Sequence, residues 1–339
     1  MKLRYLFFVS FLHLQISAQV GFNLVGYINQ EGGTNSSLYR SVTLDRNNKI
    51  VLVGQTDDSD GLIARYNENG TLDTTFNAGS VNGGPGYINV EGDTNSSIYY
   101  SVAVDRNNKI VAVGRTDNSK GLIARYNENG TLDTTFNINA VDGAPGFINT
   151  NTLTLTDFYY SVVIDRNNKI VAVGQTNDMN GDRNGLIARY HENGTLDTSF
   201  NPQNGFINGE DGTNSYVYYS VALDKNNKIV VVGQTDNNNN EINGLIVRYN
   251  ANGSLDTTFN KTGYINLAQP TNSSEYYSVV FDGNHKICAV GQTKAQVDDR
   301  HGLIARYLSN GVLDAESNWN LQNFRESNNI NKISIGLLG

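Results

Sequence analysis

The chain has 339 residues, with 34 Gly, 50 Asn, 4 Pro and one Cys, and 38% of its residues are hydrophobic. This composition excludes fully disordered, collagen-like and disulfide-stapled proteins, and its Asn and Gly content predicts many turns. The formal net charge of −8 argues against nucleic acid or an anionic membrane as a partner, because both are bound through a basic field.

Residues 1–18 have the layout of a secretory signal peptide. Lys2 and Arg4 precede the apolar run 5–14, and small residues end the segment at Ala18. The run is too short to span a membrane, so we expect a secreted or cell-surface protein with no membrane insertion. A buried N-terminal strand is the alternative interpretation of this run.

An internal repeat covers nearly all of the chain after the leader. Gly-(Tyr/Phe)-Ile-Asn begins at Gly26, Gly86, Gly146, Gly205 and Gly263, which gives spacings of 60, 60, 59 and 58 residues. Residues 61–77 and 121–137 are identical. We therefore expect five copies of one unit within residues 19–318, followed by a C-terminal tail over 319–339.

Each repeat contains four segments with strand character. In the second repeat, Tyr99–Val104 is rich in aromatic and β-branched residues, and a polar turn separates it from Ile110–Gly114. Gly121–Tyr126 is the third segment and ends at an Asn-Gly turn, and Gly146–Asn149 is the fourth. The pattern predicts a four-stranded antiparallel unit.

The apolar residues of Ile110–Gly114 are consecutive rather than alternating, so both faces of the unit must be buried. Radial stacking of the units satisfies this as a five-bladed β-propeller, whereas linear stacking would give a solenoid, whose coils are usually shorter. The fifth repeat has no Gly-Tyr-Ile-Asn after it, so we expect Gly26–Asn29 to close the ring as its outer strand. A monomer is the expected state.

The segment Gly-Leu-Ile-Ala-Arg-Tyr-Asn-x-Asn-Gly-Thr-Leu-Asp-Thr-Thr-Phe, preceded by Asp-x-Asn-Asn-Lys-Ile-Val-x-Val-Gly, resembles the delta-60 repeat of bacterial extracellular β-propellers. The resemblance covers about residues 26–318. The fifth copy departs from it, with Ala315-Glu316-Ser317 where Thr-Thr-Phe is expected. The resemblance implies a propeller scaffold and no settled activity.

Every repeat carries an Arg on its third strand and an Asp eight residues later. We expect ion pairs that hold the connection to the fourth strand, because a ring scaffold needs one joint per blade; anion sites or charge relays are the alternative. The pairs are Arg65 and Asp73, Arg125 and Asp133, Arg189 and Asp197, Arg248 and Asp256, and Arg306 and Asp314.

An Asp also begins the turn between the first two strands of each repeat, at Asp45, Asp105, Asp165, Asp224 and Asp282. Such a residue accepts hydrogen bonds from the following backbone N–H groups, a role that we favour over calcium binding. Asp58-Ser59-Asp60-Gly61 resembles the opening of a calcium loop but lacks the later Glu. We expect no metal site and no cofactor.

The loops at one end of the repeats vary, whereas the turns at the other end are almost constant. Variable loops on a rigid scaffold are where binding is expected. A Tyr follows each variable loop, at Tyr39, Tyr99, Tyr159, Tyr218 and Tyr276, and we take these five as candidate ligand-binding residues for a carbohydrate. Packing between blades is the alternative role for these tyrosines.

Sequence motifs for catalysis are scarce. Metal, nucleophile-elbow and phosphate-loop spacings do not occur after the leader, and Cys288 replaces the Val or Ala of other repeats as an expected buried thiol. The sequence favours a secreted, non-catalytic binding or adhesion module whose partner is a glycan or a cell-surface protein. A carbohydrate-active hydrolase using two of the irregular carboxylates, and a purely structural protein-interaction domain, are the alternatives. Those carboxylates are Glu210, Asp211, Glu275, Asp298 and Asp299.

Overall fold

The computed structural model describes residues 37–56, 60–79, 82–90, 97–139, 142–150, 156–177, 181–201, 205–208, 215–236, 242–267, 273–296 and 299–314. The predicted signal peptide 1–18, the predicted closing strand Gly26–Asn29 and the tail 319–339 lie outside these ranges. Within them the fold is all-β, and no helix long and apolar enough to cross a membrane occurs.

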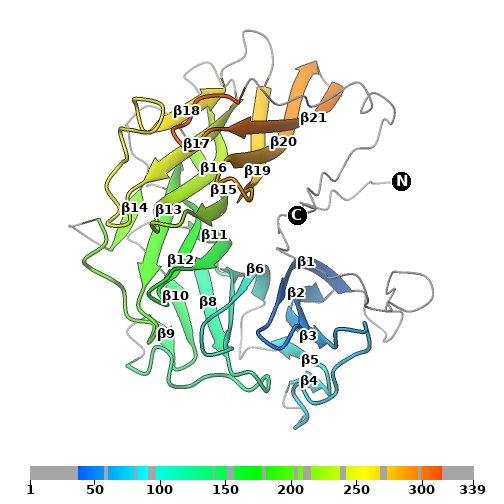
Figure 1. Cartoon of the computed structure of the whole chain (residues 1–339). Coiled ribbons are helices and arrows are strands. Elements are labelled where there is room, and N and C mark those ends of the chain that lie inside the picture. Colours follow the sequence, from blue (N-terminus) through cyan, green and yellow to red (C-terminus); the bar gives the residue numbers. More distant parts are fainter. Residues whose placement is uncertain are drawn as a thin grey trace.

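The strands form five antiparallel sheets, one for each repeat (Figure 1). The first sheet contains β1 (Ser37–Leu44), β2 (Ile50–Thr56), β3 (Gly61–Tyr66), β4 (Gly83–Gly84) and β5 (Tyr87–Val90), and the second contains β6 (Ser97–Val104), β7 (Ile110–Thr116), β8 (Gly121–Tyr126), β9 (Gly143–Ala144) and β10 (Phe147–Thr150). The third contains β11 (Thr156–Ile164), β12 (Ile170–Asn177), β13 (Arg183–Tyr190) and β14 (Phe206–Asn208), and the fourth contains β15 (Tyr216–Leu223), β16 (Ile229–Asp236), β17 (Ile242–Tyr249) and β18 (Tyr264–Leu267). In the fifth, the described strands are β19 (Ser273–Phe281), β20 (Ile287–Gln296) and β21 (Asp299–Tyr307).

The strand order within a sheet follows the chain, as the repeat predicts. In the second sheet, β6 pairs with β7, β7 with β8, and β8 with β10, all antiparallel. The Gly-Phe-Ile-Asn segment therefore supplies the fourth strand of its sheet. The two-residue strands β4 and β9, which pair with β5 and β10, were not predicted because they are too short to show a pattern.

The second strand of a sheet lies between two hydrophobic cores, which explains its consecutive apolar residues. In β7, Ile110 and Ala112 belong to the core shared with the first sheet, whereas Val111 and Val113 belong to the core shared with the third. Successive side chains of a strand point to opposite faces, so a strand buried on both sides needs an apolar residue at every position.

The sheets follow one another around an arc, as the blades of a propeller do (Figure 1). The first strands β1, β6, β11, β15 and β19 lie on the inner side of the arc, and each of the first four contacts the first strand of the next sheet. The first sheet, in blue, and the last sheet, in orange, stand at the two ends of this arc.

Candidate functional site

The tyrosines predicted to line a ligand site lie in the protein interior in four of the five sheets. Tyr99, Tyr159, Tyr218 and Tyr276 are at most 2% exposed. Each packs its ring against a glycine at the start of the third strand of the preceding sheet, as Tyr99 does against Gly61. Their hydroxyls form hydrogen bonds of 2.9 to 3.3 Å with a second tyrosine in the pairs Tyr99 and Tyr126, Tyr159 and Tyr190, Tyr218 and Tyr249, and Tyr276 and Tyr307.

The expectation that these tyrosines ring a mouth is therefore corrected for those four. They pack between sheets and bond locally, which is the alternative role given above for them. Tyr39, in the first sheet, is half-buried. Burial, followed by a hydrogen bond with Tyr66, raises the pKa of Tyr39 above its usual range.

The first strand of every sheet has a β-bulge at the residue that follows this tyrosine, so the two neighbouring side chains are oriented differently. The pairing with the second strand shifts register between Tyr99 and Ser101, so that Tyr100 is an extra residue, and the same shift occurs in all five sheets. A bulge re-aims the side chain that it carries. The extra residues are Arg40, Tyr100, Tyr160, Tyr219 and Tyr277, which we call the bulge row.

A glycine on the second strand makes the bulge possible. A Cβ added at Gly114 would lie 1.8 Å from the carbonyl oxygen of Ile98, which is far inside van der Waals contact. The same clash is found at Gly54, Gly174, Gly233 and Gly291, in the other four sheets. The repeated Val-Gly of the second strand was therefore a signal for the bulge, which the sequence analysis did not use.

The members of the bulge row are partly exposed, and each contacts the next from sheet to sheet, with the tyrosine rings tilted against one another. The ring centroids of Tyr100 and Tyr160 are 5.4 Å apart, those of Tyr160 and Tyr219 5.7 Å, and those of Tyr219 and Tyr277 5.8 Å. The guanidinium of Arg40 lies over the ring of Tyr100, 5.1 Å from its centroid. The row thus connects all five sheets through aromatic and cation–π contacts.

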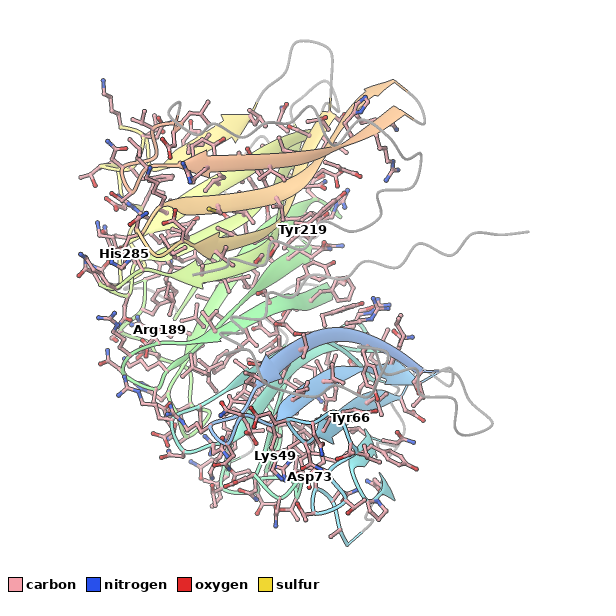
Figure 2. The ribbon with its side chains drawn as sticks, turned by 45° about the vertical axis from the view of Figure 1, so that its right-hand side comes forward. Lys49, Tyr66, Asp73, Arg189, Tyr219 and His285 are labelled. Atoms are coloured by element: carbon pink, nitrogen blue, oxygen red, sulfur yellow. The ribbon has the colours of Figure 1, made fainter. Side chains whose placement is uncertain are left out.

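The row lies toward the end of the sheets that carries the variable loops. Figure 2 shows Tyr219 on that side, whereas His285 and Arg189 lie toward the opposite end, where the constant turns are. Each member of the bulge row directly follows one of the five tyrosines that were predicted to bind a ligand.

Polar side chains from the second strands hold the bulge row in place. Tyr160 and Tyr219 donate hydrogen bonds of 3.1 and 2.9 Å to the side-chain oxygens of Gln175 and Gln234, and Arg40 donates to Gln55 at 2.8 and 3.3 Å. In the fifth sheet Tyr277 donates to Glu275 instead. In the second sheet Arg115 stands in place of Gln and lies over the ring of Phe158, 4.9 Å from its centroid.

The row presents neutral hydroxyls and aromatic faces to its surroundings. Burial raises the pKa of Tyr160, Tyr219 and Tyr277 well above the usual range, so these phenols keep their protons at physiological pH. Burial also lowers the pKa of Arg40. Ring faces beside amide and hydroxyl groups provide apolar contact together with hydrogen bonds, which is the combination that small polar ligands require.

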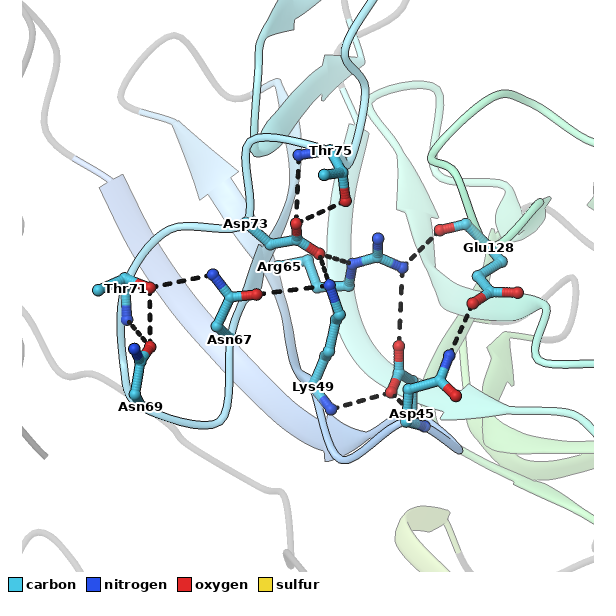
Figure 3. A network of polar contacts seen from close by, with 10 residues as sticks. Asp45, Lys49, Arg65, Asn67, Asn69, Thr71, Asp73, Thr75 and Glu128 are labelled. Atoms are coloured by element: carbon cyan, nitrogen blue, oxygen red, sulfur yellow. Dashed lines mark hydrogen bonds and ion pairs between the residues drawn. The ribbon is translucent and has the colours of Figure 1, made fainter. Parts of the chain in front are cut away.

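The opposite end of each sheet contains a repeated network of charged groups (Figure 3). In the first sheet, Asp73 accepts hydrogen bonds from Arg65 at 2.8 Å and from Lys49 and the Thr75 hydroxyl, both at 2.6 Å. Burial alone would raise the pKa of Asp73, but the bonds from Lys49 and Thr75 and the charge of Arg65 lower it to about 2. The five Arg–Asp pairs expected from the sequence all form at 2.6 to 2.8 Å, between Arg65 and Asp73, Arg125 and Asp133, Arg189 and Asp197, Arg248 and Asp256, and Arg306 and Asp314.

These arginines also join neighbouring sheets, which the sequence analysis did not foresee. The Nη1 atom of Arg65 donates to the backbone oxygen of Glu128 in the second sheet, and the side chain lies over the ring of Phe76. Arg125, Arg189 and Arg248 repeat the cross-sheet bond. One guanidinium therefore binds both the segment that connects the third and fourth strands of its own sheet and the turn after the third strand of the next sheet.

The aspartates at the first turn of each repeat accept backbone hydrogen bonds, the role favoured from the sequence. Asp45 Oδ1 accepts the N–H groups of Asn47 at 2.8 Å and Lys49 at 2.9 Å. Asp105, Asp165, Asp224 and Asp282 make the same pair of bonds. Asp58 and Ser59, in the segment that resembles a calcium loop, lie outside the described residues.

The irregular carboxylates do not form a pair that the structure describes. Glu210, Asp211 and Asp298 lie outside the described residues, the side chain of Asp299 is not described, and Glu275 accepts a hydrogen bond from the Tyr277 hydroxyl. Cys288 is 2% exposed, and burial raises the pKa of its thiol to about 11. A thiol in that state is a packing residue, not a nucleophile.

Four segments of the chain match a family described as "Domain of unknown function (DUF5122) beta-propeller", at residues 46–76, 106–136, 166–200 and 225–259. Each match runs from the first turn of a repeat to the phenylalanine after its Arg–Asp pair. No curated protein matches the chain.

Solved structures with a similar arrangement include a protein of unknown function from Dyadobacter fermentans, with 9% identity, 82% of each chain covered and a TM-score of 0.48. A gluconolactonase from Xanthomonas campestris has 9% identity and a TM-score of 0.40, over 75% of this chain and 69% of its own. A polysaccharide lyase described as an ulvan lyase has 10% identity and a TM-score of 0.46, over 78% and 67%. At these identities and scores the similarities carry no information about function.

Proposed function

We propose that the chain, four segments of which match the DUF5122 β-propeller family, is a secreted, non-catalytic binding or adhesion module whose ligand is a carbohydrate. The ligand lies on the bulge row, at the end of the sheets that carries the variable loops. The observation that carries this proposal is the row of four partly exposed tyrosines, each from a different sheet and each in ring contact with the next.

Two features of the row support a binding role. In every sheet a β-bulge, together with the glycine that it requires, orients one side chain of the row. Bulges are typical of positions where a side chain must be re-aimed for function. The tyrosine hydroxyls and glutamine amides are fixed by mutual hydrogen bonds, so that little side-chain entropy is lost when a ligand binds.

We also propose that the five sheets close into a ring, which would bring Tyr277 of the fifth sheet next to Arg40 of the first. Glycines on the first and fifth sheets are more exposed than the corresponding glycines of the other sheets, which an aromatic ring covers. Gly302 is exposed, whereas Gly61, Gly121, Gly185 and Gly244 are each covered by a tyrosine of the next sheet. Tyr39 is the tyrosine that would cover Gly302.

The closing strand in this proposal is Gly26–Asn29. In the fourth sheet, Ile265 pairs with Ile246, and the Arg248 N–H donates to Gly263 O at 2.9 Å. The same register in the fifth sheet would put Ile28 opposite Ile304 and the carbonyl of Gly26 at the N–H of Arg306.

The sequence similarity between the proposed closing strand and the fourth strand of the fourth sheet extends to the residues before each strand. Residues 22–29 (FNLVGYIN) and 259–266 (FNKTGYIN) are identical at six of eight positions. Phe259 is fully buried against Gly311 of the next sheet, and Phe76, Phe136 and Phe200 occupy equivalent places. The fifth repeat has Ser317 at this position, and Gly70, its counterpart glycine in the first sheet, is partly exposed. In the closed propeller, the phenyl ring of Phe22 would pack against Gly70.

Export by the signal peptide 1–18 places this module outside the cell in our proposal. A closed ring leaves no long sheet edge for a second copy, so we propose a monomer. A glycan, free or on a cell-surface protein, is the partner.

Binding and turnover of the protein against a broad glycan and polysaccharide panel, with calcium and with chelator, test the proposal. We expect saturable binding without product that is lost in Tyr160→Ala and retained in Tyr264→Ala, which removes an exposed tyrosine from an outer strand. Product formation would establish the hydrolase alternative. Absence of binding across the panel would refute a carbohydrate ligand and favour the structural interaction domain.

A further inference from the structure

The bulge row departs from its repeat at two places, and these places meet in space. Arg40 stands where the other four sheets have a tyrosine, and Arg115 stands where the other four have a glutamine. The guanidinium of Arg40 lies over the ring of Tyr100, and Arg115 lies over the ring of Phe158. The ring centroids of Tyr100 and Phe158 are 5.4 and 6.3 Å from that of Tyr160, so the two cations border the same part of the row. Burial lowers the pKa of Arg40; Tyr100 opposes that change, and the charge of Arg115 adds to it. Two independent departures from a repeat have thus produced one local concentration of positive charge.

We propose that Arg40 and Arg115 form an anion subsite, and that the carbohydrate bound by this protein therefore carries carboxylate or sulfate groups. This inference rests on the binding function proposed above and adds the chemical class of its ligand.

The surroundings of Arg115 favour an anion from outside the chain. Its guanidinium is half-buried over the ring of Phe158, and within the described ranges neither a carboxylate nor another hydrogen-bond acceptor engages it. The third-strand arginines are different, because each is bound to an aspartate, as Arg65 is to Asp73. A guanidinium positioned by an aromatic ring keeps its N–H edges for planar, bidentate recognition of an oxyanion.

The guanidinium of Arg40 is positioned by Gln55 and Tyr100. Its Nε and Nη2 atoms donate to Gln55, and its guanidinium lies over Tyr100. Two guanidiniums of like charge in a partly desolvated place oppose each other, and a bound anion would relieve that repulsion. Because the adjoining tyrosines are held neutral, they add ring faces and hydroxyls beside the anion subsite and no competing negative charge.

Further cations border the row, although the whole chain has a net charge of −8. Arg183 opposes the rise that burial causes in the pKa of Tyr160 and Tyr219, and Arg300 does so for Tyr277. The carboxylate of Glu275 has the opposite effect and raises the pKa of Tyr219 and Tyr277. An acidic protein with a local basic site attracts an acidic ligand to that site and repels it elsewhere.

The test compares dextran, carboxymethyl-dextran and dextran sulfate as ligands of the full chain, because the three share one backbone and differ in charge. The variants Arg40→Tyr and Arg115→Gln each restore the residue of the other four repeats, so both are expected to fold. Arg166→Gln is the control, since it removes an exposed positive charge at the opposite end of the sheets.

We expect carboxymethyl-dextran or dextran sulfate to bind more tightly than dextran, with affinity that falls as salt rises. Which of the two binds more tightly distinguishes a carboxylate from a sulfate ligand. Each consensus variant should weaken acidic binding by about 10- to 100-fold, as expected for a lost hydrogen bond to a charged group, and Arg166→Gln should leave it unchanged.

Equal affinity for dextran and its acidic derivatives, or equal loss in Arg166→Gln, would overturn the anion subsite and leave the carbohydrate-binding proposal standing. If neither these polymers nor the broader glycan panel bound, the proposed function would fail and the subsite with it.

Discussion

Tyr159 and Tyr160 are adjacent in sequence, but Tyr159 is fully buried between two sheets, whereas Tyr160 is partly exposed and stacked between Tyr100 and Tyr219. The bulge between Tyr159 and Ser161 separates their environments. One tyrosine therefore contributes to the core and its neighbour to the candidate site, and substitutions should separate the two roles.

Tyr159→Ala should destabilise the protein by about 3 to 5 kcal/mol, because it leaves a cavity where a large buried ring was. Tyr160→Ala should cost less stability and instead reduce ligand binding. Chemical denaturation together with a binding assay measures both effects. Equal stability losses in the two variants would contradict this separation.

The sequence predicted the sheets well and the site only approximately, for a definable reason. The strand order, the turn aspartates and the Arg–Asp pairs each recur in five repeats, and each follows from local chemistry, as for Asp45 and its two backbone donors. The exposed tyrosine was misassigned because side chains alternate along a strand and one inserted residue changes the face. Cross-sheet bonds such as Arg65 to Glu128 depend on how sheets stack, which no local pattern encodes.

Gly174→Ala tests the bulge directly. An added Cβ would lie 1.8 Å from the carbonyl oxygen of Phe158, so the strand pair must distort, and we expect a loss of at least about 2 kcal/mol. Gly283→Ala is the matched control, since no atom lies within 4 Å of its added Cβ. Urea unfolding of both variants gives the comparison, and a neutral Gly174→Ala would show that the bulge can be lost at no cost.

The charged networks should make stability fall in acid. Burial on its own would raise the pKa of Asp133, but hydrogen bonds from Lys109 and Thr135 and the charge of Arg125 lower it to about 2. A carboxyl whose folded pKa lies below its unfolded value of 3.8 stabilises the protein fully above pH 4, and that contribution is lost as pH falls toward 2. Asp133→Asn should lower stability at pH 7 and flatten its dependence between pH 4 and 2, as followed by thermal melting at each pH.

His285→Asn should stabilise the protein by about 0.5 to 1 kcal/mol. In three earlier repeats an Asn at this turn position accepts a backbone N–H from the preceding sheet, as Asn108 does from Arg46 at 2.9 Å and Asn168 from Arg106 at 3.0 Å. His285 has the same positive φ of 61°, which Asn tolerates well, and restoring the amide would extend these bonds to the fifth sheet. An unchanged melting temperature would mean that the turns of the fourth and fifth sheets are not placed like the others.

If the ring closes as proposed, the N-terminal segment is important for stability. Phe22→Ala should lower the melting temperature about as much as Phe259→Ala, because both rings would fill the same kind of place beneath a third-strand arginine and against a glycine of the next sheet. Deletion of residues 19–30 should destabilise the protein further, since it would also remove the proposed closing strand beside β21. Ile138→Ala, which truncates an exposed apolar side chain, is the control. If Phe22→Ala melted like the unaltered protein while Phe259→Ala did not, the segment 22–29 would not be the fourth strand of the fifth sheet, and the gap between the first and fifth sheets would need another occupant.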